Sequence, residues 1–167
     1  MVMLTDKKVI ECVPNFSEGR NLDIIDKIAS AVKSTQNVKL LNVEPDKDYN
    51  RTVITFAGEP SGVKEAAFNA ISTASELIDM SRQKGEHPRI GATDVCPIIP
   101  VANATREECV KLANELGSEV GEKLGIPVYL YEDAARSEER RNLENIRKGE
   151  YEGLEQKLRD WVPDYGP

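Results

Sequence analysis

The sequence predicts an α+β domain with a ferredoxin-like β-α-β-β-α-β core, extended by a helix and a strand and then by C-terminal helices. The first observation is the order in which short β-branched segments and segments of helical periodicity follow one another. The second is the length of 167 residues, which suits one domain with a substantial core. The third is a composition of 40% hydrophobic and 31% charged residues, typical of soluble globular proteins. We expect a mostly antiparallel sheet with helices on one face.

The first half of the chain contains three expected strands, at residues 9–16, 38–43 and 52–56. Pro14 ends the first strand or confines it to an edge, because proline cannot donate a backbone hydrogen bond. Asn21 is suited to cap a helix whose apolar residues recur at helical spacing: Ile24, Ile25, Ile28, Ala31 and Val32. The polar segment 44–50 contains a proline and is expected to be a loop.

The second half begins with an alanine-rich helix that starts near Ser61. An expected strand at residues 93–101 is interrupted by prolines and is therefore an edge or irregular strand. Thr105-Arg106-Glu107-Glu108 fits the capping-box pattern of a following helix. A strand at residues 128–131 and charge-rich helices from Ser137 onward complete the prediction.

Two glycines of the helix after Thr105 are expected to bring a neighbour close to its backbone. Gly117 and Gly121 lie one turn apart, and Gly125 then ends the helix. The tail Trp161-Val162-Pro163-Asp164-Tyr165-Gly166-Pro167 consists of turn-forming residues and has the character of a linker.

Composition argues against several classes of function. The net charge of −7 argues against a nucleic-acid partner, which would require a basic surface. No apolar run is long enough to span a membrane and residues 1–8 lack a signal-peptide pattern, so we expect a cytoplasmic protein. Three distant cysteines and one histidine do not supply a zinc site of the usual spacing, so no metal is expected.

The only histidine lies in an unusual segment, Lys84-Gly85-Glu86-His87-Pro88-Arg89-Ile90-Gly91. Histidine changes its charge near neutral pH and is therefore the natural proton carrier at physiological pH. Loops on a rigid scaffold are where catalytic residues tend to lie. His87 is the first candidate for acid-base catalysis, whereas an isolated loop histidine is more often a surface residue.

Several segments together carry a family resemblance. The longest is Gly85-Glu-His-Pro-Arg-Ile-Gly-Ala-Thr-Asp-Val-Cys-Pro-Ile-Ile-Pro-Val101. Others are Glu11-Cys-Val-Pro-Asn-Phe-Ser-Glu-Gly19, Asn50-Arg-Thr-Val53, Leu77-Ile-Asp-Met-Ser-Arg82, Pro127-Val-Tyr-Leu-Tyr131 and Trp161-Val-Pro-Asp-Tyr-Gly-Pro167. The chain resembles, over essentially its whole length, the N-terminal subdomain of glutamate formimidoyltransferase. In animals that activity resides in formimidoyltransferase-cyclodeaminase.

The resemblance implies both a reaction and a division of the chain. The family transfers a formimidoyl group from N-formimidoyl-L-glutamate to N5 of tetrahydrofolate, which is a co-substrate. His87 corresponds to the family's catalytic histidine, which acts as general base and then as general acid. Gly166 and Pro167 match the start of a folate-contacting linker. We expect residues 1–160 to form the N-terminal subdomain and residues 161–167 to begin a linker to a C-terminal subdomain.

Four further residues are candidates for catalysis or substrate binding. Glu44 stands where the family carries aspartate, so a carboxylate is kept but displaced by one methylene. Arg51 and Arg89 either grip substrate carboxylates or form ion pairs of the protein itself. Asn15 lies in the loop before the first helix, where loop amides favour anions.

The carboxylate that would orient the imidazole of His87 is left open. Glu86 and Asp94 are both near it in the sequence, and each is otherwise a solvated or capping carboxylate.

Two interpretations of the whole chain follow. The first is one half of a formimidoyltransferase, joined to a C-terminal subdomain that is a separate chain or has been removed. The second is a non-catalytic module that binds folate or mediates dimerisation, and transfer of a formyl group is a related alternative. We expect a homodimer or a heteromer with small-molecule substrates, because a missing subdomain would leave apolar surface exposed.

Overall fold

A computed structural model describes residues 6–83, 85 and 89–167 of the chain. The described residues form one sheet of six strands: β1 (Val9–Cys12), β2 (Asn15–Phe16), β3 (Val38–Asp46), β4 (Arg51–Gly58), β5 (Thr93–Val95) and β6 (Ile98–Ala102). Strand β4 lies between β3 on one side and β1 with β2 on the other, and β6 and β5 pair with β1 and β2. Every pair is antiparallel, so the α+β class and the ferredoxin-like strand arrangement are confirmed.

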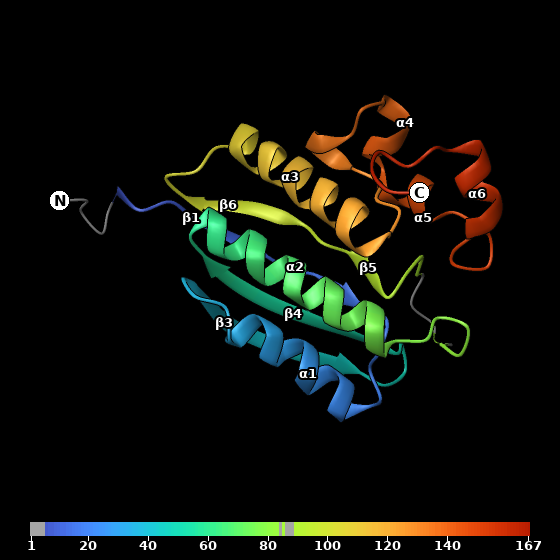
Figure 1. Cartoon of the computed structure of the whole chain (residues 1–167), viewed down its shortest axis with the longest axis horizontal. Coiled ribbons are helices and arrows are strands. Elements are labelled where there is room, and N and C mark those ends of the chain that lie inside the picture. Colours follow the sequence, from blue (N-terminus) through green and yellow to red (C-terminus); the bar gives the residue numbers. More distant parts are fainter. Residues whose placement is uncertain (1–5, 84, 86–88) are drawn as a thin grey trace.

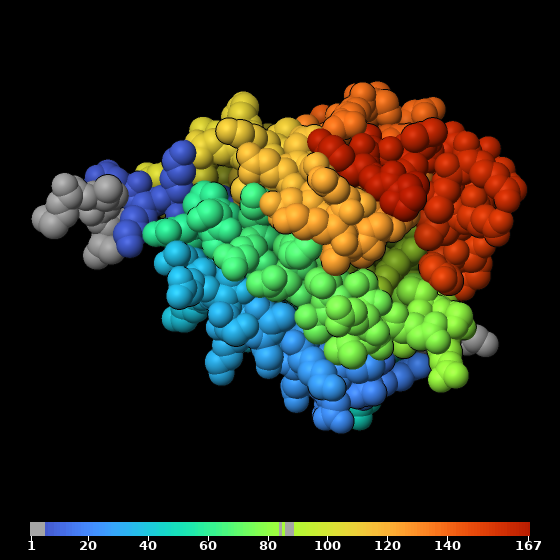
Figure 2. Space-filling view, viewed as in Figure 1, coloured from blue at the N-terminus to red at the C-terminus, as the bar shows by residue number. Residues whose placement is uncertain are grey.

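Three long helices lie side by side on one face of the sheet: α1 (Leu22–Lys33), α2 (Pro60–Leu77) and α3 (Arg106–Leu124) (Figures 1 and 2). The shorter elements gather beyond α3 at one end of the molecule (Figure 1): the 3₁₀ helix η2 (Glu132–Ala134), α4 (Glu138–Arg141), α5 (Leu143–Arg147) and α6 (Leu154–Asp160). Within the part of the chain that the structure describes, no helix combines the length and apolarity needed to cross a membrane.

The core lies between the long helices and one face of the sheet. Its strand residues alternate along the chain because successive side chains point to opposite faces. The most deeply buried members are Ile10, Cys12, Phe16, Ile28, Val32, Ile54, Phe56 and Val63. Alanines of α2 bring that helix close to the sheet, since Ala66, Ala70 and Ala74 are fully buried.

Both strands expected to carry prolines are divided in two. Residues 9–16 form β1 and β2 on either side of Val13 and Pro14, and residues 93–101 are divided at Cys96 and Pro97. The two interruptions lie side by side, since the amide of Val13 donates to the carbonyl of Pro97 at 3.3 Å. The prolines therefore bend two neighbouring strands at the same level of the sheet.

The loop expected at residues 44–50 is shorter than predicted. Glu44, Pro45 and Asp46 belong to β3 and pair with Val53, Thr52 and Arg51 of β4. Pro45 is tolerated because the described part of β3 pairs only with β4, which leaves one edge without a partner strand.

The strand expected at residues 128–131 is wrong as a sheet strand. This segment makes a single antiparallel bridge, between Val128 and Tyr165 of the C-terminal tail. The extended backbone was correctly indicated by its β-branched and aromatic residues, but its partner is the tail and not the sheet.

Two helix starts follow the sequence prediction closely. The Asn21 side chain accepts hydrogen bonds from the amides of Asp23 and Ile24. The Thr105 hydroxyl accepts from the amide of Glu108 at 3.1 Å. Each side chain satisfies backbone donors that a helix leaves without intrahelical partners.

The close neighbour expected at the glycines of α3 is the C-terminal tail. A Cβ at Gly117 would lie 2.9 Å from the ring of Tyr165, and one at Gly121 would lie 2.5 Å from the amide nitrogen of Gly166. Gly166 itself has φ of +84° and a Cβ there would meet the carbonyl oxygen of Ile126 at 2.4 Å. The tail is therefore seated directly on the helix backbone.

We predict that Gly121→Ala destabilises the chain although alanine favours helix by about 1 kcal/mol over glycine. The new Cβ meets backbone, which cannot move aside as a flexible side chain would. We expect a net loss of about 1–3 kcal/mol in the free energy of unfolding, measured by urea denaturation, with faster proteolysis after Trp161. Glu122→Ala, at an exposed position of the same helix, is the control. A Gly121→Ala variant as stable as this control would contradict the proposed seating of the tail.

Candidate functional site

Three loops meet at one end of the sheet, and together they form the candidate functional site. The first follows β2 and includes Ser17, Glu18 and Gly19; the second is the β3–β4 turn around Asn50; the third runs between α2 and β5 and contains the histidine segment. Buried polar contacts connect all three. His87 and Glu86 lie outside the described residues, which reach Gly85 on one side of them and resume at Arg89 on the other.

Asn50 is the central residue of this junction. It is buried and has a left-handed backbone with φ of 53°. Its Oδ1 accepts a hydrogen bond from the amide of Gly19 at 2.8 Å, and its Nδ2 donates to the side chain of Gln83. One side chain therefore joins the first loop, the second loop and the start of the third.

Glu18 reinforces the same junction from a buried position. Its Oε1 accepts from the side-chain amide of Gln83 at 3.3 Å. Its Oε2 accepts from the backbone amides of Arg20 and Asn21 at 3.0 and 3.1 Å. Its backbone carbonyl accepts from the hydroxyl of Thr52 on β4. These bonds hold the loop after β2 at the start of α1, where backbone amides lack intrahelical partners.

Close backbone packing adds a steric constraint at the same place. A Cβ at Gly19 would lie 2.1 Å from the carbonyl oxygen of Asp46, and a Cβ at Gly85 would lie 2.2 Å from that of Tyr49. Only glycine permits these approaches. Gly85, two residues before His87, is thereby placed against the β3–β4 turn.

The chain after His87 is held by ion pairs from the C-terminal elements. The guanidinium of Arg89 contacts Glu150 at 3.1 Å and Glu152 at 2.7 Å, and it donates to the Gln83 carbonyl at 2.9 Å. The Glu152 carboxylate holds the pKa of Arg89 above its ordinary value. Of the two roles considered for Arg89, the structure places its guanidinium in ion pairs of the protein itself.

Asp94, one of the two carboxylates considered as a partner of His87, has two contacts within the described part of the chain. One oxygen accepts from the amide of Ile90 at 2.6 Å, and the other pairs with the guanidinium of Arg147. On the other side of the same loop, the Ser17 hydroxyl donates to the Gly91 carbonyl at 2.7 Å. Asp94 therefore shapes the loop through its backbone.

Asn15, Glu44 and Arg51 lie on the face of the sheet opposite the long helices. Asn15 lies on β2 and not in the loop expected before the first helix. Asn15 and Glu44 are both paired with Val53, one from each side, so Asn15, Val53 and Glu44 form one row across the strands. Neighbouring strands lie about 4.8 Å apart, which puts Asn15 and Glu44 about 10 Å from each other. Arg51 precedes Val53 by two residues and shares this face.

This open face also carries exposed apolar side chains. Ile99 and Val101 of β6 are 43% and 56% exposed, and Leu41 of β3 is 52% exposed. Leu41 and the pair Ile99 and Val101 lie on opposite sides of β4, so the open face presents apolar side chains on both sides of the strand that carries Arg51.

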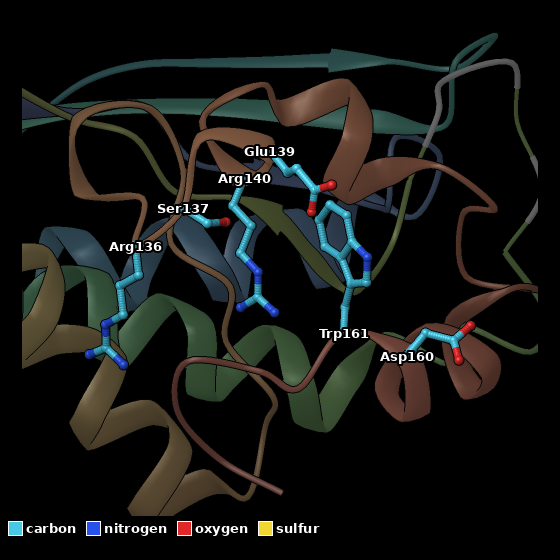
Figure 3. Close-up of a pocket in the computed structure, with 6 residues that line it drawn as sticks. All are labelled: Arg136, Ser137, Glu139, Arg140, Asp160 and Trp161. Carbon is cyan, nitrogen blue, oxygen red and sulfur yellow. The ribbon is translucent and has the colours of Figure 1, made fainter.

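Gly166 and Pro167 lie apart from the three loops, at the far end of the C-terminal tail. The tail is anchored by Asp164, whose carboxylate accepts from the amide of Leu130 at 2.7 Å and pairs with Arg140 at 3.2 Å. Figure 3 shows the Arg140 side chain beside the ring of Trp161, and the guanidinium carbon lies 5.3 Å from the centre of that ring. They border a small cavity of about 270 Å³ with Arg136, Ser137, Glu139 and Asp160.

A larger cavity of about 940 Å³ lies among β5, β6, α3 and the C-terminal elements. Most of its lining is apolar, from residues such as Ile78, Leu116, Leu130 and Ile146. Its polar groups include Thr93, whose hydroxyl is buried without a hydrogen-bond partner, and Tyr131, whose pKa is raised by burial. A volume of this size falls in the range of small-molecule sites.

Two cysteines meet beside this cavity. The sulfur atoms of Cys12 and Cys96 are 3.5 Å apart, and burial raises the pKa of the Cys12 thiol well above its usual value, with the Cys96 contact adding to the effect. Among the residues described, no group of three or more histidine, cysteine, aspartate or glutamate side chains is arranged to hold a metal ion.

Sequence reasoning missed the residues that connect the loops. No role is predicted from the sequence for Asn50, Gln83 and Glu18, nor for Glu150 and Glu152. A signal did exist for Asn50, since asparagine is among the few residues that tolerate a left-handed backbone. No local pattern indicates that Glu152 reaches Arg89, because 63 residues separate them.

Comparison with known proteins gives a consistent result. The family model for the formiminotransferase domain, N-terminal subdomain, matches residues 9–167. The chain is 52% identical over 162 residues to formimidoyltransferase-cyclodeaminase of Dictyostelium discoideum, covering 96% of this chain and 30% of that protein. The corresponding protein of Gallus gallus is 54% identical over the same coverage.

A shorter relative matches over a larger share of its length. Glutamate formimidoyltransferase of Streptococcus pyogenes is 47% identical over 161 residues, covering 95% of this chain and 54% of that protein. The chain therefore spans about half the length of this relative and less than a third of the two longer ones.

We predict that Asn50→Ala lowers the free energy of unfolding by about 1–3 kcal/mol, because it leaves the buried amide of Gly19 without its acceptor. Asn37→Ala is a matched control, since Asn37 is exposed and has a similar φ of 63°. Chemical denaturation of both variants separates the lost hydrogen bonds from backbone strain. Equal losses in the two variants would contradict the role assigned to the Asn50 side chain.

Proposed function

Because the chain belongs to the formiminotransferase family, as its N-terminal subdomain, we propose that it forms one half of a glutamate formimidoyltransferase. The observation that carries the proposal is 47% identity, over 95% of the chain, to a protein named for this activity. The substrates would be N-formimidoyl-L-glutamate and tetrahydrofolate, and the pathway context would be histidine degradation and one-carbon metabolism.

The reaction requires one proton to be removed and one to be delivered. N5 of tetrahydrofolate attacks the formimidoyl carbon to give a tetrahedral intermediate, and the bond to the glutamate nitrogen then breaks. A neutral imidazole at His87 would take the proton from N5 and return it to the departing nitrogen. No metal or covalent enzyme intermediate is needed for this proton balance.

The second half of the site would come from a C-terminal subdomain. Relatives continue well beyond the matched region, and the open sheet face carries exposed Ile99 and Val101 on β6. We propose that the C-terminal subdomain covers this face, so that the substrates lie between it and the side chains of Asn15, Glu44 and Arg51. In this arrangement the Arg51 guanidinium, which lies 5.4 Å from the centre of the Tyr49 ring, would contact a substrate carboxylate, and residues 161–167 would lead toward that subdomain.

We predict that the chain has transferase activity only together with the C-terminal subdomain of its enzyme. In the complete enzyme, His87→Ala should lower kcat by about 10²–10⁴, the contribution of one positioned acid-base group. Arg159→Ala, in an exposed ion pair on α6, serves as the control. Steady-state kinetics with both substrates is the measurement. Full activity of the His87→Ala enzyme would disprove the catalytic assignment.

The 940 Å³ cavity favours a second candidate, in which the chain alone binds folate without catalysis. The two candidates place the ligand differently and so respond to different variants. Ala113 lines the cavity, and Ala113→Leu would partly fill it, whereas Arg51 lies on the open face.

We predict that calorimetric titration with tetrahydrofolate gives weak binding to the lone chain and binding at least about tenfold tighter with the C-terminal subdomain. Arg51→Ala should weaken the tighter binding, and Ala113→Leu should leave it unchanged. Tight binding to the lone chain that is lost in Ala113→Leu would instead establish a folate-binding module.

A further inference from the structure

We propose that Arg89 and Asp94 are positioning residues that fix the catalytic loop to the C-terminal elements. We name their set of contacts with Arg147, Glu150 and Glu152 the C-terminal clamp. The inference deepens the proposed function and rests on it in one respect: the loop matters for catalysis only if His87 is the acid-base group.

The geometry of Arg89 is that of an internal clamp. The residue is only 8% exposed, and its two terminal nitrogens contact Glu150, Glu152 and the carbonyl of Gln83. The backbone takes part as well, since the amide of Tyr151 donates to the Arg89 carbonyl at 2.9 Å. The guanidinium thus joins the two ends of the histidine segment to the turn before α6.

Asp94 makes a second and independent connection. Its side chain is fully buried and pairs with Arg147 at the end of α5. The same carboxylate accepts from the amide of Ile90, which lies three residues after His87. A buried carboxylate with both a cation and a backbone donor is satisfied in place and holds the loop backbone with it.

The difference in solvent exposure between Arg89 and its two carboxylate partners explains how the clamp holds the loop. The arginine is buried whereas the side chains of Glu150 and Glu152 are 45% and 66% exposed. An exposed surface ion pair contributes roughly 0–1 kcal/mol, but a buried charge that loses its partner is costly. Removing the carboxylates should therefore displace the loop that carries Arg89 and leave the core of the domain folded.

Residues 147–152 contact Arg89 and Asp94, and both residues belong to the segment that follows His87. Catalytic groups need neighbours that fix their position, because small errors in that position reduce the rate strongly. The clamp gives the C-terminal elements a role in catalysis although they supply none of the candidate catalytic residues.

The test is a double variant, Glu150→Gln with Glu152→Gln, compared with the charge-matched control Glu138→Gln with Glu155→Gln at exposed positions. We expect lower heteronuclear NOE values at the amides of Gly85, Arg89 and Ile90 in the clamp variant, with unchanged values in the control. Because the Asp94 connection is independent, the same comparison is made for Arg147→Gln, which removes its cation. Unchanged values in the clamp variant and in Arg147→Gln would overturn the clamp.

Kinetics of the complete enzyme provide the second readout. The clamp variant should lose about tenfold or more in kcat with KM nearly constant, because chemistry and not substrate binding depends on the position of the histidine. Arg89→Lys keeps the charge but not the forked geometry, and it should recover part of the rate lost in Arg89→Gln. Equal activity of the clamp variant and the control, or a loss confined to KM, would also overturn the proposal.

The two hypotheses fail in distinguishable ways. If the wild-type complete enzyme transfers no formimidoyl group, the proposed function is wrong, and the NMR comparison still decides whether the clamp orders the loop. If transfer occurs and depends on His87 but the clamp variant matches its control, the function stands and the clamp is wrong.

Discussion

The buried polar junction around Asn50 is the interaction on which the candidate site depends. Three loops from distant parts of the chain end at the same edge of the sheet, and apolar packing alone would not set their relative positions. The Asn50 side chain does so by bonding to Gly19 and Gln83, while glycines at positions 19 and 85 allow backbones to touch. Each buried hydrogen bond contributes about 0.5–1.5 kcal/mol, but a broken one leaves a buried group unsatisfied at greater cost.

The two faces of the sheet have different tasks. One face carries the core under α1, α2 and α3, and this packing makes the sheet rigid. The other presents Asn15 and Glu44 on either side of Val53, Arg51 two residues before Val53, and exposed Ile99 and Val101 on β6. The C-terminal elements lie on the helical side of the sheet. From there Glu150, Glu152 and Arg147 hold the loop between α2 and β5.

Much of the fold could be predicted because its signals are local. The caps at Asn21 and Thr105, the alternation along β4 and the close approach at Gly121 each depend on a few neighbouring residues. The extent of β3 through Pro45 could not be read locally, since proline is acceptable there only because β3 lies at an edge. The segment 128–131 was similarly ambiguous, because extended backbone does not reveal which segment will pair with it.

The candidate site was only partly predictable, for a related reason. Residue types suggested His87, Arg51 and Asn15, but the role of Arg89 depends on carboxylates more than 60 residues away. The most direct test of how the loops are held is amide hydrogen exchange of Gly19, whose amide donates to Asn50 in the junction, and of Ile90, whose amide donates to Asp94 in the C-terminal clamp. Our account predicts that both amides exchange far more slowly than in an unstructured loop. Exchange at the rate of unprotected amides would show that the loops are not held together in this way.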